Sequence, residues 1–144
     1  MSYITQTDIE DIFGTTNVAK WSQRSQASTS TTADTARIAD AITYAEDVVN
    51  SRFRHVSRYT IPFVATGSAM DQSVVYWCAA LAGVWLFNGR GATTDKNADG
   101  DGIRSHRAIA MAEMDAVLAG TRRLACQTDP GTGTGRATAP VGVA

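Results

Sequence analysis

The sequence predicts an all-α fold: a small bundle of about four helices with long polar loops and an extended C-terminal tail. Two observations carry this prediction. Apolar residues recur at helical steps of four and three between Ile38 and Phe53. Residues 71–89 form one segment with no charge between Asp71 and Arg90, and it holds two of the three tryptophans. At 144 residues, the length fits one domain with a tail.

Two short helices are expected near the N-terminus. Thr7 and Glu10 have capping-box spacing, and Gly14 is a typical helix stop. This first helix has one apolar face, made of Ile9, Ile12 and Phe13. A second helical turn is expected over residues 17–22, with Val18 and Trp21 facing inward, followed by a polar Ser/Thr loop over residues 22–32.

The next helix is expected to begin at Asp34 or Thr35. Its apolar stripe consists of Ile38, Ile42, Ala45, Val49 and Phe53. Pro62 disfavours a helix at Ile61, so residues 59–63 are expected to form an extended connector.

The segment over residues 71–89 is predicted to be a helix that is apolar nearly all round, capped by Ser68 or Asp71 and ended by Asn88-Gly89. Such a helix has to be covered on most sides. It is either the centre of the bundle or partly buried by another protein. Three apolar faces elsewhere in the chain can cover it, so we expect the centre of the bundle. A membrane span needs about 20 residues, which argues against a transmembrane segment.

A last helix is expected from Arg104 to Ala119, with Gly120 as its stop. Its buried face is expected to hold Ala110, Met111, Met114, Val117 and Leu118. A Gly/Asp-rich loop is expected before it, over residues 90–102. Residues 127–144 contain Gly, Thr, Pro, Ala and Val with two charges and cannot form a core alone. We therefore expect a helical domain over residues 1–126 and a tail over 127–144.

Charge is unevenly distributed along the chain. Residues 1–50 hold three basic and seven acidic side chains, a net charge of −4, whereas residues 51–144 hold ten basic and seven acidic ones, a net of +3. The total of −1 gives no general attraction to nucleic acid or to an anionic membrane. The halves can complement each other within the fold or between copies. Asp40, Asp47, Arg54, Arg58, Arg104 and Arg107 are candidates for charge contacts between subunits.

The two cysteines predict neither a disulfide framework nor a metal site. Cys78 is expected to be a buried free thiol, and a reducing compartment fits this composition. The first residues lack the basic start and apolar run of a signal peptide.

Asp95, Asn97, Asp99 and Gly100 match the beginning of a calcium-binding loop. The twelfth position of that loop, which needs a bidentate glutamate, is His106 here. Asp95, Asn97 and Asp99 therefore form only a weak metal-site candidate, and no metal or other cofactor is expected.

Residues 5–23 have the outline of a helix-turn-helix. Lys20 stands where that motif needs an apolar residue, and residues 1–50 are acidic, which argues against DNA binding. His55 and His106 both lie among arginines and are expected at the surface or at helix ends, without a triad or a paired acid/base site. We therefore expect a protein without catalytic residues.

Four segments in order resemble a family of Mu-like prophage proteins: DIEDIFG (8–14), AITYAEDVVNSRF (41–53), YTIPF (59–63) and AEMDAVLAGTRRL (112–124). The resemblance spans about residues 3–125. This family is similar to the head–tail connector, or adaptor, proteins of long-tailed phages. The chain departs from the family in the Ser/Thr composition of residues 22–33 and in the long Asp-rich segment 90–102.

The resemblance implies a small helical protein whose copies form a ring, commonly of about twelve, below the portal. The ring would extend the channel through which the genomic DNA passes without sequence readout, and it would bind the next neck or tail-completion protein. The protein would be located in the neck of the virion, assembled in the host cytoplasm, with no membrane partner. In related adaptors the C-terminal segment reaches the portal, which makes Arg136, Pro140, Val141 and Val143 candidate portal-binding residues. The alternatives are another neck protein such as a stopper, or a calcium- or DNA-binding regulator.

Overall fold

The computed structural model describes residues 2–23, 32–54, 56, 59–65, 70–89 and 98–124. The described residues form helices and no strands, which confirms the predicted all-α class. The helices are α1 (Gln6–Phe13), α2 (Thr15–Ser22), α3 (Thr35–Phe53), α4 (Gln72–Gly89) and α5 (Ala98–Leu118). The boundary predicted between domain and tail, at residue 126, lies outside the described residues.

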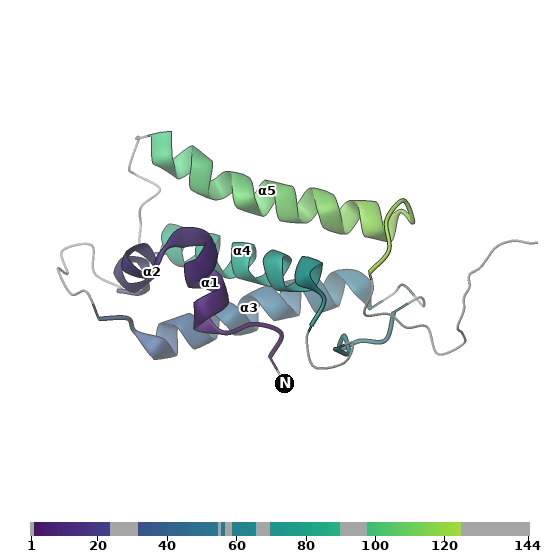
Figure 1. The fold of residues 1–144 in the computed structure, drawn as a ribbon, viewed down its shortest axis with the longest axis horizontal. Coiled ribbons are helices and arrows are strands. Elements are labelled where there is room, and N and C mark those ends of the chain that lie inside the picture. The colour runs from purple at the N-terminus through teal and green to yellow at the C-terminus, as the bar shows by residue number, and fades with distance from the viewer. Residues whose placement is uncertain are drawn as a thin grey trace, which may run out of the picture.

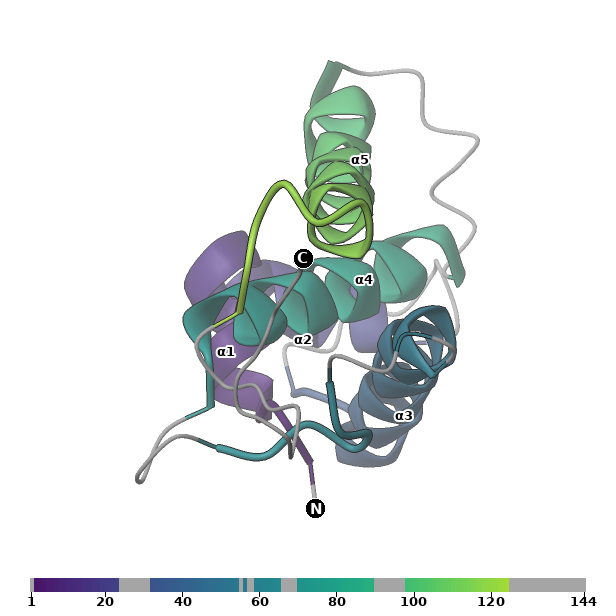
Figure 2. The same ribbon diagram turned by 90° about the vertical axis from the view of Figure 1, so that its right-hand side faces the viewer.

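Helix α4 is the centre of the bundle. It packs against α1, α2, α3 and α5, and eleven of its 18 residues are buried. Helices α3, α4 and α5 are the three long helices and run antiparallel to one another in succession. Helices α1 and α2 pack across α4 (Figure 1). The end-on view shows α5 lying on α4, away from α1 and α2 (Figure 2). The structure thus confirms that most of the apolar surface of α4 is covered within one chain.

The two N-terminal helices begin earlier than the sequence analysis placed them. Thr5, not Thr7, caps α1: its backbone N–H donates to the Asp8 carboxylate at 2.7 Å. Aspartate accepts this bond as well as the expected glutamate would, because the motif needs only an acceptor three residues after the cap. Gly14 ends α1 at φ 92°, a conformation that favours glycine, and α2 begins directly after it at Thr15.

A glycine lets α1 approach the backbone of α4 closely. A Cβ atom on Gly83 would lie 2.0 Å from Cε2 of Phe13, so the Phe13 ring occupies the space that a side chain would need. The same ring makes edge contacts with Trp21 and His106, at centroid distances of 5.4 and 5.2 Å. Trp21 packs in turn on Phe87 of α4 at 5.2 Å. This side of α4 is therefore filled by aromatic rings from α1 and α2.

Helix α3 begins as expected, with Asp34 as its cap accepting from the backbone N–H of Arg37 at 3.1 Å. Its buried stripe differs from the predicted one at one position. Ala41 is fully buried, whereas Ile42 is half-buried at the edge of the core. The small alanine lets α3 lie close to α4.

The segment over residues 59–65 has no helix or strand, in agreement with the predicted connector. Two tyrosine hydroxyls hold it to distant parts of the chain. The hydroxyl of Tyr3 accepts from the backbone N–H of Phe63 at 2.8 Å and donates to Asn50 at 2.6 Å. The hydroxyl of Tyr59 accepts from the backbone N–H of Leu124 at 3.1 Å. These bonds close one end of the bundle around Phe53.

The start of the last helix was predicted wrongly. Helix α5 begins at Ala98, so residues 98–102 belong to the helix and not to the preceding loop. The Asp and Gly residues that indicated a loop are tolerated in the first turns of a helix, where aspartate interacts favourably with the dipole. The helix ends near Gly120 as expected, at φ 86°. Ala110, Met114 and Val117 are buried, while Met111 and Leu118 are half-buried.

Candidate assembly surfaces

The side of α4 opposite to α1 and α2 carries a groove between α3 and α5, here called the α3–α5 groove. Its volume is about 290 Å³, near the lower end of the range for ligand pockets. In Figure 2, α5 lies above α4 and α3 lies to its right. Its lining consists of Tyr44 from α3, Arg107 from α5, and Leu81, Val84, Trp85, Asn88 and Gly89 from α4.

The aromatic part of the groove is ordered by stacking. The ring of Tyr44 stacks on that of Trp85, with centroids 5.9 Å apart and planes at 26°. The guanidinium carbon of Arg37 lies 4.5 Å from the Trp85 ring centroid, within the range of a cation–π interaction. Tyr44 remains 36% exposed and Trp85 is half-buried. Two large rings thus present apolar surface that the fold leaves uncovered.

The α5 rim of the groove is basic. Arg104 donates from Nε to the side-chain oxygen of Asn88 at 3.3 Å and lies over the Phe87 ring. Arg107 is exposed and makes no hydrogen bond or ion pair with the residues that the structure describes. Nε of Arg37 lies at the far end of the groove. It is buried and has no hydrogen-bond partner among the described residues. The rim therefore holds positive charge that the fold itself does not neutralise.

The α3 rim is acidic instead. Asp40 and Asp47 are exposed there, at positions that flank Tyr44 along the helix. The α3 side of the groove therefore carries two carboxylates beside the Arg37 guanidinium, whereas the α5 side carries Arg104 and Arg107.

Helix α1, on the opposite side of α4, is acidic throughout. It contains Asp8, Glu10 and Asp11 and no basic residue. Asp8 serves the helix cap, and Glu10 accepts from the Gln6 side chain at 2.8 Å. Asp11 is exposed and points away from the core, since it lies between the buried positions Ile9 and Phe13. The two outer sides of the bundle thus differ in charge.

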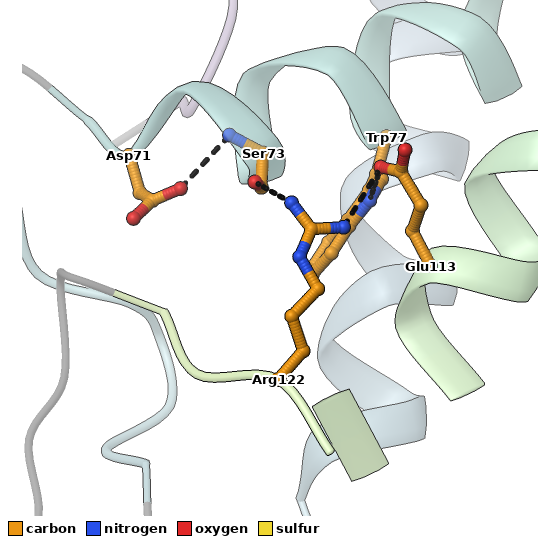
Figure 3. A network of polar contacts seen from close by, with 5 residues as sticks. All are labelled: Asp71, Ser73, Trp77, Glu113 and Arg122. Carbon is orange, nitrogen blue, oxygen red and sulfur yellow. Dashed lines mark hydrogen bonds and ion pairs between the residues drawn. The ribbon is translucent and has the colours of Figure 1, made fainter. Parts of the chain in front are cut away.

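A polar network holds the C-terminal end of α5 onto the start of α4 (Figure 3). The Trp77 indole N–H donates to Oε1 of Glu113 at 2.9 Å, and the Arg122 guanidinium approaches the same oxygen at 3.6 Å. Arg122 also donates to the Ser73 hydroxyl at 3.1 Å, while Asp71 caps α4 through the backbone N–H of Ser73 at 2.8 Å. This network fixes α5 at the end remote from Arg107.

An ion pair between Arg52 and Asp115 links α3 to α5 at the same end of the bundle. Both side chains are partly exposed, at 29% and 66%, so the pair contributes little to stability and mainly positions the two helices.

Two titratable groups, the buried Cys78 and the half-buried Glu46, have shifted pKa values. Burial raises the pKa of the Cys78 thiol, which is fully buried as the sequence analysis expected. Burial also raises the pKa of Glu46, although the hydrogen bond from the backbone N–H of Tyr3 acts in the opposite direction. Both groups are packing features, because neither faces an open surface with a second reactive group.

The residues predicted for subunit contacts are distributed over three places. Arg104 and Arg107 lie on the α5 rim, Asp40 and Asp47 on the α3 rim, and Arg54 is exposed at the end of α3. Arg58 and the portal candidates Arg136, Pro140, Val141 and Val143 lie outside the described residues. Of these charges, Arg107 lines the groove, and Arg104, Asp40 and Asp47 lie on the two helices that flank it.

Of the weak calcium candidates, Asp95 and Asn97 lie outside the described residues, and Asp99 lies in the first turn of α5. A calcium loop needs irregular backbone at that position, so the helical start contradicts the loop geometry. Nowhere in the described ranges do three or more His, Cys, Asp or Glu side chains gather closely enough to hold a metal ion.

His106 is placed differently from the prediction. It is half-buried, with Nδ1 3.0 Å from the Tyr76 hydroxyl and its ring edge on Phe13. The neighbouring arginines in the sequence indicated a solvated face, but helical geometry turns His106 toward α4 while Arg107 faces the groove. His55 lies outside the described residues.

The sequence analysis missed the aromatic part of the groove. Arg37 and Tyr44 are seven residues apart, which places them on one face of α3, and this face is not the buried stripe. That spacing, together with a tryptophan in a helix apolar on all sides, was the available signal.

Among the described helices, none has the length and hydropathy required to cross a membrane.

Comparison with known proteins identifies the family. The family model described as Bacteriophage Mu, Gp36 matches residues 3–141, nearly the whole chain. No curated protein and no solved structure matches the chain. The motif order, the helical fold and this match agree, and the chain therefore belongs to the Bacteriophage Mu Gp36 family and is a bacteriophage protein.

Proposed function

We propose that this protein is a structural head–tail connector, or adaptor, of a tailed phage virion and performs no catalysis. Its copies form a ring below the portal in the neck of the virion. The ring extends the DNA channel and binds the next neck or tail-completion protein. The match to the Mu Gp36 family over residues 3–141 carries the proposal as far as a phage protein. The resemblance of the ordered motifs to connector proteins carries it to the neck.

The arrangement of charge supports a protein that assembles with copies of itself. The α3–α5 groove exposes Tyr44, Trp85 and the guanidinium of Arg107, which has no ion-pair partner among the described residues, whereas α1 exposes carboxylates on the other side of the bundle. Monomeric proteins usually cover large aromatic rings or leave them scattered, and rings gathered in a groove are typical of binding surfaces.

Deletion of the gene from the phage that carries it tests the proposal. We expect DNA-filled heads and separate tails that do not join, seen by electron microscopy of the lysate. Purified protein added to such heads should restore joining and appear as a ring below the portal. Infectious particles that form normally without this protein would refute the role.

A further inference from the structure

We propose that the α3–α5 groove of one copy binds α1 of a second copy, with the arginines of the α5 rim facing the carboxylates of α1. This inference rests on the proposed ring and deepens it by naming the contact between neighbouring subunits. The occupant is therefore a second copy of this chain.

In Figure 2, α1 lies to the left of α4, whereas α3 and α5, whose residues line the groove, lie to its right and above it, so one copy can use both surfaces at once. A contact between different patches of identical subunits is heterologous, and its repetition closes into a ring or extends into a filament. A contact of one patch with itself would end at a dimer. The placement of groove and α1 thus has the symmetry that a ring requires.

The lengths of the two surfaces agree. The groove follows α4 from Leu81 to Gly89, which corresponds to about 12 Å at the helical rise. Helix α1 has eight residues and is likewise about 12 Å long. The groove volume of about 290 Å³ is too small for a whole helix, so only side chains on the outer face of α1 would enter it.

Apolar and charged groups of α1 match the groove in kind. Ile12 is half-buried and packs against the core of its own copy, so only its exposed edge can reach the apolar floor formed by Val84 and Trp85. Asp11 is its neighbour and is exposed, so the same approach brings a carboxylate toward Arg107. Arginine binds carboxylates through two parallel hydrogen bonds, which adds geometric specificity to the contact.

The unequal rims fix the orientation of the bound helix. The α1 carboxylates are attracted by Arg104 and Arg107 on α5; on α3 the attraction of Arg37, which lies over Trp85, is opposed by the repulsion of Asp40 and Asp47. They therefore face α5 and not α3, which gives one register between subunits. Because these charges lie near the surface, salt should weaken the contact.

A charge exchange tests this contact. The variants Asp11→Arg and Arg107→Asp each place like charges opposite one another and should raise the protein concentration needed for half-maximal assembly at least about tenfold. The double variant restores an attractive pair and should assemble within about threefold of the wild type. Assembly is measured by sedimentation velocity and by counting rings in negative-stain micrographs. Thermal unfolding of each variant checks that it is folded.

Arg123→Asp is the matched control, because it makes the same charge change at an exposed residue outside the groove. It should assemble like the wild type. Because the contact is heterologous, a mixture of the two single variants should also assemble, since every subunit boundary then pairs opposite charges.

The possible failures are distinguishable. If the wild type forms rings and both single variants form them equally well, the groove does not bind α1, while the proposed function stands. If both single variants fail and the double variant fails as well although folded, direct pairing of Asp11 with Arg107 is wrong. A wild type that stays monomeric alone and with the portal would refute the ring and this contact together.

Discussion

Both sides of α4 are apolar, but the other helices cover them to different extents. On one side, Phe13 and Trp21 fill the surface so closely that α4 needs a glycine at position 83. On the other side, α3 and α5 diverge and leave Trp85 half-buried beside Tyr44. The helix is apolar on both sides, so hydrophobicity alone does not distinguish them. The difference shows which part of the apolar surface of α4 the described helices cover and which part they leave accessible.

The largest loss of stability is expected from Phe13→Ala, on the side of α4 that α1 and α2 cover. The substitution removes a buried ring that contacts α4, Trp21 and His106, and should lower the free energy of unfolding by about 3–5 kcal/mol. Urea denaturation followed by circular dichroism measures the change. A loss below about 1 kcal/mol would mean that this side is not tightly packed.

Gly83→Ala should destabilise the protein by about 1–3 kcal/mol, because the new Cβ meets the Phe13 ring, which its aromatic neighbours hold in place. In a Phe13→Ala background the same substitution should instead stabilise by up to about 1 kcal/mol, since alanine has the higher helix propensity. A double-mutant cycle measures this change of sign. Equal effects in both backgrounds would contradict a direct contact.

On the groove side, Trp85→Ala should lower the free energy of unfolding by only about 1–2 kcal/mol. The loss comes from the stacking with Tyr44 and the cation–π contact with Arg37. Trp21→Ala is the matched comparison, because that tryptophan is only 6% exposed and should cost about 3–5 kcal/mol. Similar losses for both tryptophans in chemical denaturation would remove the distinction between the two sides.

The smallest effect concerns Glu46, which accepts from Tyr3 at the edge of the filled side. Its raised pKa means that the folded state binds the proton more tightly than the unfolded state does. The resulting stability is present at low pH and is lost as the pH rises through the raised pKa. Glu46→Gln should therefore match the wild type near pH 4 and exceed it at pH 7 by no more than about half a kcal/mol, because the carboxyl is largely solvent-screened. Thermal unfolding at several pH values measures the difference, and a variant that is less stable at pH 7 would contradict it.

Helical periodicity predicted the fold class, the central place of α4 and most of the buried residues. The stripe from Ile38 to Phe53 and the stops at Gly14 and Gly120 needed only local information, since spacing and glycine conformation determine them. The predicted start of α5 was wrong because Asp and Gly residues are typical both of loops and of helix N-termini.

The groove was harder to predict than the core. Its lining comes from three helices, and whether Tyr44 and Arg107 meet depends on the angle at which α3 and α5 leave α4. Sequence patterns predict which face of a helix is buried but not this angle. Arg104 and Arg107 were nevertheless identified as contact candidates from charge alone, and both lie on one rim.

The attachment of α5 has a consequence for the order of folding and assembly. Residues from α3, α4 and α5 line the groove, and α5 is the last helix in the chain, held mainly by α4 and by the Glu113 and Asp115 contacts. In the proposed ring, a copy whose α5 is not docked would present the acidic α1 but no groove to receive one. Such a copy would add to one side of a growing ring and would not accept the next subunit. Docking of α5 would thereby set when a subunit can extend the proposed assembly.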